Sequence, residues 1–273
     1  QTLLSKSYND ARRKLITDRA SLELRPGIVE GLDWRLDVGA ATRRADLKKG
    51  AGAGEPTVGA LAGPSPGREG EPTTSKMGHV RGDTVHLDII DRHGNMVSAT
   101  PSGGWLQSSP IIAELGLCLG TRGQMFWLDA KAPAALVPGK RPRSTLSPGI
   151  ALRDGEAYLA FGTPGGDQQD QWATQLLLRH IHAGQNLQEA IDCPAFHTEH
   201  ILSSFWPRTV RTGVVVVEGR MPKATVAELR RRGHTVEVGD DWSEGRLTAA
   251  ARDGRMLKAA ANPRGMQGYA VGR

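Results

Sequence analysis

The sequence has few cysteines and no long apolar run. Only two of its 273 residues are cysteines, Cys118 and Cys193, and they have neither metal-ligand spacing nor a disulfide framework around them. We therefore expect both to be small buried residues. No stretch approaches the ~20 uncharged residues of a membrane span, so we expect no membrane partner.

Basic residues are not concentrated in one region either. The formal net charge of +6 is spread along the chain, and the densest basic run, "LRRRGH" at 229–234, is typical of the polar end of a short amphipathic helix. Proteins that bind nucleic acid more often gather Lys and Arg in one stripe with aromatic residues between them, so we expect no nucleic-acid partner. Two histidine pairs do not fit a zinc site. His180 and His182 are too close in sequence to share one helix face, and His197 and His200 have no third ligand nearby. We expect neither a metal nor an organic cofactor.

Glycine and proline, in contrast, are abundant over residues 50–82, which hold nine glycines and four prolines. Such a segment cannot bury enough apolar surface to offset its ordering entropy, and we expect residues 50–83 to be flexible. Before it, residues 5–20 carry apolar residues at helical spacing behind a Ser5 or Ser7 cap. This pattern predicts a helix in a separate N-terminal part, residues 1–49.

From Thr84 onward the sequence predicts regular structure. Val85, Leu87 and Ile89 alternate with other residues, which indicates a strand with one apolar face that begins at Thr84. The elements expected after it are a returning strand after a turn at 92–95, a hairpin about Asp154–Gly155, helices over 167–182 and after Asn186, a strand at 210–219, a helix ending at Gly233 and a last hairpin at 245–263. This order predicts an α+β layered domain over residues 84–273.

Thr84 directly follows the flexible segment and opens the strand, which is the arrangement that self-cleavage requires. The Asp83–Thr84 bond would be accessible, and the new N-terminus would be held rigidly. After cleavage, Thr84 would carry a nucleophile, its Oγ, and a base, its α-amino group, which titrates near ~8. The alternative is that Thr84 is simply a β-branched strand residue.

Two loops could bind the substrate of such a nucleophile. "GTPGGD" at 162–167 places Gly165 and Gly166 between a strand and a helix, where their N–H groups could form an oxyanion hole. In "GKRPRSTLSP" at 139–148, the hydroxyls of Ser144 and Thr145 could hydrogen-bond a substrate carboxylate. The alternatives are a strand-to-helix turn that merely needs glycine and a capped turn that precedes a strand.

Four motifs in this order, "DTVHLDIIDRHGNMVSAT", "GKRPRSTLSP", "GTPGGD" and "NLQEAIDCPAFH", resemble the small subunit of γ-glutamyltransferases. These are the glutathione hydrolases of the N-terminal nucleophile superfamily. The resemblance covers residues 84–273 almost continuously, and "LLSKSYNDARRKLITDRA" resembles the last helix of the large subunit. It implies a four-layer αββα sandwich, here incomplete because most of the large subunit is missing, and a precursor that cleaves itself before a catalytic threonine.

The resemblance also implies roles for individual residues. Thr84 would be the nucleophile that cleaves γ-glutamyl amides such as glutathione through an acyl-enzyme, and Ser102 would support its amino group. The residues that would hold the substrate α-carboxylate and the oxyanion are Ser144, Thr145, Gly165 and Gly166. The partners implied are a small-molecule amide substrate and the large-subunit segment of the same precursor.

Two positions depart from the family pattern. Gly104 stands where asparagine is usual, and Arg122 falls near the place of the residues that hold the substrate α-amino group. Arg122 is thus a substrate-binding candidate, and it favours an acylase for an amide that lacks this amino group, such as a glutaryl side chain. A non-catalytic homologue that never matures is the third possibility.

Overall fold

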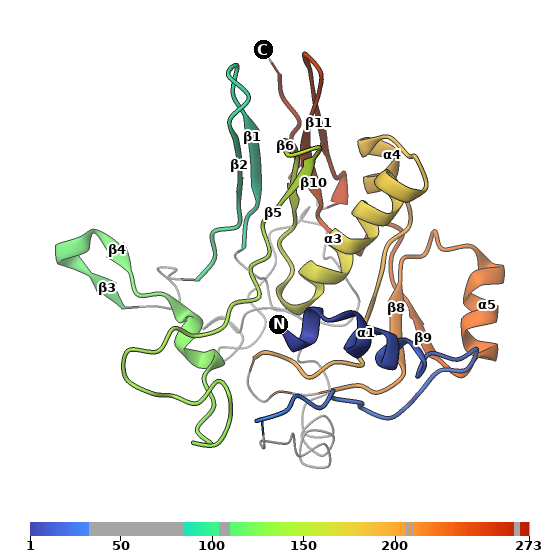
Figure 1. The fold of residues 1–273 in the computed structure, drawn as a ribbon. Coiled ribbons are helices and arrows are strands. Elements are labelled where there is room, and N and C mark those ends of the chain that lie inside the picture. The colour runs from blue at the N-terminus through green and yellow to red at the C-terminus, as the bar shows by residue number, and fades with distance from the viewer. Residues whose placement is uncertain (33–83, 104–109, 206–207, 209, 265–267, 273) are drawn as a thin grey trace, which may run out of the picture.

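The structure is a computed structural model that describes residues 1–32, 84–103, 110–205, 208, 210–264 and 268–272 (Figure 1). The segment predicted to be flexible, residues 50–83 with the Asp83 side of the cleavage site, lies outside the described residues. Residues 33–49 of the predicted N-terminal part and Gly104 lie outside them as well.

A four-stranded antiparallel sheet forms the centre of the fold, with strand order β11-β10-β6-β5. Its strands are β5 (Gly149–Arg153), β6 (Glu156–Gly162), β10 (Thr248–Asp253) and β11 (Met256–Ala261). The hairpin predicted about Asp154–Gly155 is confirmed, because both turn residues have positive φ, 53° and 84°, as a two-residue turn of this kind requires. The last hairpin is confirmed as well, with Gly254 in its turn.

Two helices cover one face of this sheet, α3 (Gln169–Leu177) and α4 (Leu187–Asp192). The shared core holds Leu159 of β6, Trp172 and Leu176 of α3, and Ile191 of α4. The helix predicted over 167–182 is confirmed, with a 3-10 turn (Gly166–Gln168) before α3 and a π turn (Leu178–His182) after it. The predicted cap of α4 is confirmed too, since the Asn186 side chain accepts the Glu189 N–H in a capping box.

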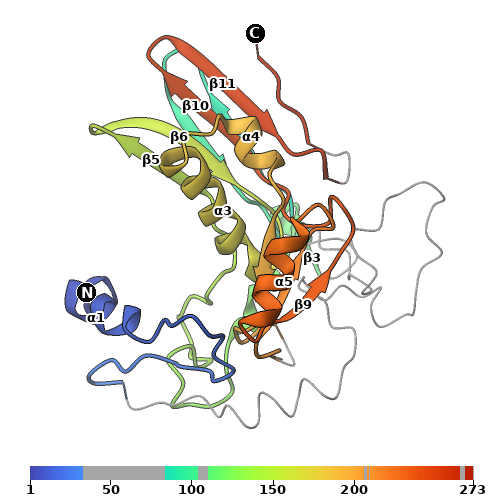
Figure 2. The ribbon, with the colours of Figure 1, turned by 90° about the vertical axis from the view of Figure 1, so that its right-hand side faces the viewer.

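A separate ribbon of two antiparallel strands, β1 (Leu87–Ile90) and β2 (Met96–Ala99), packs on the other face of the central sheet (Figure 2). Ser98 Oγ donates a hydrogen bond to the Phe161 carbonyl of β6 (3.1 Å), and Thr248 Oγ1 of β10 donates one to Asp88 (2.8 Å). Helices, central sheet and ribbon therefore form three layers in this order.

The ribbon buries the face opposite to the one that the sequence predicts. The side chains of His86 and Asp88 are 0% and 2% exposed, whereas Val85, Leu87 and Ile89 are 39–55% exposed. The reason is that Thr248 of β10 donates to Asp88, and that the His86 ring bonds to Thr100 and Asp88 and packs on Gly162 of β6. No layer of the described residues covers the apolar side. Ladder pairing also begins at Leu87 and not at Thr84.

A smaller unit consists of β7 (Phe196–Thr198), β8 (Val214–Val217), β9 (Thr235–Val238) and α5 (Lys223–Arg231). Strands β8 and β9 are parallel and are connected through α5, which packs on them through a core of valines. The predicted strand at 210–219 and the predicted helix ending at Gly233 are both confirmed.

The N-terminal helix is shorter than predicted. It is α1 (Lys6–Arg13), preceded by a 3-10 turn (Thr2–Leu4), and the Ser5 side chain caps it as expected. The helix predicted to reach residue 20 ends early because the chain turns away toward α5, where the Ala20 N–H donates to the Arg232 carbonyl (2.8 Å). The apolar residue Ile16 consequently remains 77% exposed.

A short arm projects from the body of the molecule (Figure 1). It contains β3 (Ile111–Ile112), a 3-10 turn (Ala113–Leu115) and β4 (Leu117–Cys118), and a 3-10 turn, η4 (Thr121–Met125), follows it. Both cysteines are free and half-buried, so they are less buried than predicted. Among the described residues, no helix is long and apolar enough to cross a membrane.

Candidate active site

The structure brings Thr84 and Ser102 together at the open end of the ribbon. Their side-chain oxygens lie 2.6 Å apart, and both residues are half-buried. The strand register explains this contact: Leu87 lies opposite Ala99, and the same register continued by three residues puts Thr84 opposite Ser102. The Val85 N–H, which donates to the Pro101 carbonyl (3.3 Å), extends the pairing beyond the formal end of the strands.

His86 fixes the start of this ribbon on the end of β6. Its Nδ1 lies 2.7 Å from the Thr100 hydroxyl, and its Nε2 lies 3.0 Å from the Asp88 carboxylate. The imidazole packs on Gly162, where a Cβ would come within 2.3 Å of the ring. Sequence reasoning gave His86 and Asp88 no role of their own, although two polar residues on one face of an apolar strand were the available signal.

Gly165 and Gly166 form the turn that follows β6. Both have positive φ, 135° and 57°, and the Trp172 ring lies so close to Gly165 that a Cβ there would meet it at 2.3 Å. No other amino acid fits this conformation and this space. Neither glycine N–H donates to an acceptor within the described residues.

The loop with Ser144 and Thr145 is fastened to the first turn of α3, next to the glycine turn. The Ser147 N–H donates to Gln169 Oε1 (3.1 Å), and Ser147 Oγ donates to Asp170 Oδ1 (2.5 Å). Ser144 is exposed, whereas Thr145 is buried and its Oγ1 has no hydrogen-bond partner among the described residues. A buried hydroxyl without a partner requires an explanation, and a bound ligand would supply one.

Arg122 lies half-buried on η4, and a buried arginine connects this turn to the glycine loop. Arg208 donates to the Phe126 carbonyl (2.9 Å) and to the Ser204 carbonyl (2.7 Å). The Ser204 N–H in turn donates to the carboxylate of Asp167, the residue after Gly166 (2.8 Å). Sequence reasoning missed this chain of contacts, because nothing in the pattern indicates that distant segments meet here.

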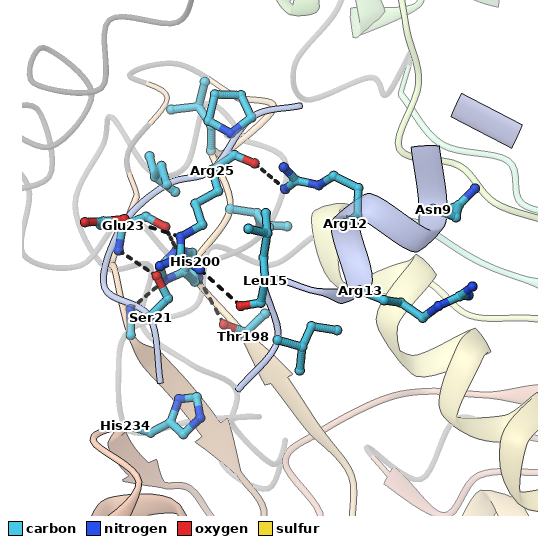
Figure 3. Close-up of a pocket in the computed structure, with 16 residues that line it drawn as sticks. Asn9, Arg12, Arg13, Leu15, Ser21, Glu23, Arg25, Thr198, His200 and His234 are labelled. Carbon is cyan, nitrogen blue, oxygen red and sulfur yellow. Dashed lines mark hydrogen bonds and ion pairs between the residues drawn. The ribbon is translucent and has the colours of Figure 1, made fainter. Parts of the chain in front are cut away.

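A pocket of about 650 Å³ lies elsewhere, between the N-terminal segment and the loop after β7 (Figure 3). His200 joins the two sides: its Nδ1 accepts the Gly213 N–H (2.8 Å), and its Nε2 lies 3.0 Å from the Glu23 carbonyl. None of the predicted site residues lines this pocket. It marks the place where residues 1–32 attach to the rest of the chain.

Histidines of both pairs are bonded to other protein side chains. His180 lies 2.6 Å from the Tyr158 hydroxyl, and His197 Nδ1 lies 2.5 Å from Glu244 Oε2. In the part of the chain that the structure describes, no three His, Cys, Asp or Glu side chains gather as metal ligands would.

A hydroxyl pair at the head of a ribbon that His86 anchors to β6, and a glycine turn three residues further along the chain, are typical of one class: hydrolases with an N-terminal nucleophile. The comparisons with known proteins agree with this class. The profile of the gamma-glutamyltranspeptidase family matches residues 1–272, and the chain belongs to that family. This confirms the resemblance that the sequence motifs indicated.

Among curated relatives, the chain is similar to the oxamate amidohydrolase proenzyme of Klebsiella pneumoniae. The two are 36% identical over 187 residues, which are 67% of this chain and 34% of the relative. The chain is also similar to the glutathione hydrolase-like YwrD proenzyme of Bacillus subtilis. These two are 34% identical over 199 residues, which are 71% of this chain and 36% of the relative. The chain thus spans about a third of the length of these relatives.

Solved structures show the same fold. The LmbA2991 T421A structure matches 100% of this chain and 44% of its own chain, with TM-score 0.78 and 52% identity. The gamma-glutamyltranspeptidase of Pseudomonas nitroreducens complexed with L-DON matches 69% of this chain and 97% of its own chain, with TM-score 0.54 and 27% identity. The cephalosporin acylase of Bacillus halodurans matches 66% of this chain and 32% of its own, with TM-score 0.55 and 29% identity. The fold is therefore that of the N-terminal nucleophile hydrolases, as predicted, and this chain holds part of it.

Proposed function

We propose that the protein is an amidohydrolase and acyltransferase that cleaves itself before Thr84 and then uses Thr84 as its nucleophile. The observation that carries this proposal is the 2.6 Å contact between the Thr84 and Ser102 hydroxyls, on a ribbon that His86 anchors to the end of β6. Gly165 lies three residues after that anchor point. The His86–Gly162 contact thus joins the ribbon that carries Thr84 to the strand that leads into the glycine turn.

We also propose the corresponding division of the chain. Residues 1–49 would be the end of the large subunit, residues 50–83 the segment before the cleavage site, and residues 84–273 the small catalytic subunit. In support, 69% of this chain matches 97% of the Pseudomonas nitroreducens chain. The relatives are also named proenzymes, and members of the family are processed from one precursor into two subunits.

Maturation would begin when Thr84 Oγ adds to the carbonyl carbon of Asp83. The C–N bond then breaks as the Thr84 nitrogen takes a proton, and an ester between Asp83 and Thr84 Oγ remains. The α-amino group of Thr84 is free once the C–N bond has broken, and water then hydrolyses the ester to the Asp83 carboxylate and the Thr84 hydroxyl. This amino group titrates near ~8, a suitable range for a general base.

Turnover would then use the same residue twice. Thr84 Oγ attacks the substrate amide carbon while its proton passes to its own α-amino group, and Ser102 holds that group in place. The N–H groups of Gly165 and Gly166 receive the oxyanion of the tetrahedral intermediate, for which each well-aimed donor contributes ~3 to 4 kcal/mol. The leaving amine takes the proton, and water or another amine resolves the acyl-enzyme.

We propose a γ-glutamyl amide such as glutathione as the first candidate substrate. Ser144 and Thr145 would bind its α-carboxylate, and the buried Thr145 Oγ1 without a partner supports a ligand at this place. A second candidate is an amide without the α-amino group, such as a glutaryl side chain. Arg122 on η4 favours it, and so do the relatives named oxamate amidohydrolase and cephalosporin acylase.

A comparison of two matched anilides separates these candidates. The full-length protein is assayed with γ-glutamyl and glutaryl p-nitroanilide, which differ only in the α-amino group. A large preference in kcat/KM for the γ-glutamyl compound excludes the acylase, and the reverse preference excludes the glutathione hydrolase. A protein with intact Thr84 that stays one chain and cleaves neither compound would instead be the non-catalytic homologue.

A further inference from the structure

Behind the glycine loop lies a buried ionic cluster that the proposed reaction does not use. Its centre is His197 on β7, which is 4% exposed. Its Nδ1 lies 2.5 Å from Glu244 Oε2, and its Nε2 lies 3.6 Å from Glu199 Oε1. A buried imidazole between two carboxylates is an arrangement that favours the charged ring.

The charges around His197 come from several elements. Glu244 precedes β10 and is 2% exposed, and Glu199, just after β7, also pairs with Arg211 (2.7 Å). From α3 the uncharged Trp172 meets the ring, and β8 places Val216 opposite it. Burial lowers the pKa of His197, but the hydrogen bond to Glu244 and the nearby charges of Glu199 and Glu244 outweigh burial and raise the pKa to about 9.

His197 reaches the glycine loop by two routes. The first is Trp172, which stands edge-on to His197, with ring centroids 5.8 Å apart at 89°, and packs its other side against Gly165. The second is the backbone after Glu244, since the Arg246 N–H donates to the buried Thr163 hydroxyl (3.1 Å), two residues before Gly165.

We propose that the His197 imidazolium is a positioning residue that holds the Thr163–Gly166 loop in the conformation required for an oxyanion hole. Loss of the charge would leave two buried carboxylates facing each other across the imidazole, and Glu244 and the segment up to Arg246 would move. The role rests on the proposed function, because it assigns the oxyanion to the loop. It concerns kcat more than KM, since the loop would bind the transition state and not the ground state.

The test compares His197→Gln and Glu244→Gln with a matched control, His93→Gln, which changes an exposed histidine on the β1–β2 turn. We expect His197→Gln in the full-length protein to lower kcat by roughly 10- to 100-fold, the effect of a displacement of up to ~1 Å, with KM nearly unchanged. His93→Gln should retain wild-type kcat. A His197→Gln protein with wild-type kcat would overturn the proposal.

The pH profile supplies a readout that a purely structural role would not move. Wild-type kcat should fall as pH rises through about 9, where His197 loses its proton. His197→Gln should lack this fall, and Glu244→Gln should shift it to lower pH because one carboxylate partner is gone. The same alkaline fall in all three proteins would contradict the proposal.

A second measurement keeps the inference separate from the proposed reaction. Exchange of the amide hydrogens of Thr163, Gly165 and Gly166 at pH 7.5 reports the order of the loop without any substrate. We expect faster exchange in His197→Gln than in wild type and in His93→Gln. A wild-type protein without Thr84-dependent turnover but with this difference refutes the proposed function alone, whereas equal exchange refutes the role of His197.

Discussion

Gly162→Ala tests whether the contact between His86 and the end of β6 holds the nucleophile in place. The new Cβ would lie 2.3 Å from the imidazole Cε1, and the side chain of His86 is fully buried with hydrogen bonds to both ring nitrogens. Overpacking of this kind costs about 1–3 kcal/mol, and the loss of one buried hydrogen bond adds about 1 kcal/mol. The total of roughly 2–4 kcal/mol corresponds to a fall in Tm of roughly 5–15 °C.

The same variant should lose activity beyond its loss of stability. Thr84 is two residues from His86, and a shift of ~1 Å in a reacting group costs ~100-fold in rate. Thermal unfolding and turnover of the anilides are measured well below Tm, with Gly120→Ala as control, because a Cβ there meets open space at an ordinary φ of −64°. Wild-type turnover and stability in Gly162→Ala would refute the reasoning.

Two further predictions concern buried charge and the uncovered face of the ribbon. Arg264→Met should destabilise the protein by about 1–3 kcal/mol in urea unfolding, because it removes one of the two arginines that pair with the fully buried Glu218 carboxylate at 2.7 Å and leaves only Arg220. Glu218→Gln added to it should restore part of the loss, and no restoration would refute this pairing. Val97, opposite Ile89 on the exposed side of the ribbon, is 49% exposed in this chain. We expect a further layer of the full-length protein to bury this side of the ribbon, so Val97→Asp should destabilise that protein by about 3 kcal/mol or more. An unchanged Tm would contradict this and show that the side remains in water.

Local signals in the sequence predicted most of the secondary structure. The Asp154–Gly155 turn and the Asn186 cap depend on residues that are neighbours in the chain, so pattern and propensity suffice for them. The order of the elements was enough for the α+β class.

Contacts between distant segments could not be predicted. The buried side of β1 is decided by the hydrogen bond of Asp88 to Thr248 on β10 and by the packing of His86 on Gly162 of β6, which overrode the apolar alternation of Val85, Leu87 and Ile89. The end of α1 is decided by a contact with Arg232 at the far end of the sequence. The roles predicted for Thr84 and the glycine pair come from short sequence motifs, whereas the roles inferred for His86 and His197 depend on contacts seen only in three dimensions.

Intact-mass measurement of the purified full-length protein tests the central claim most directly. Self-cleavage predicts two species whose masses place the break between Asp83 and Thr84, and a Thr84→Ala variant that remains one chain. A wild-type protein that remains a single species after prolonged incubation, or that breaks at another bond, would contradict the account.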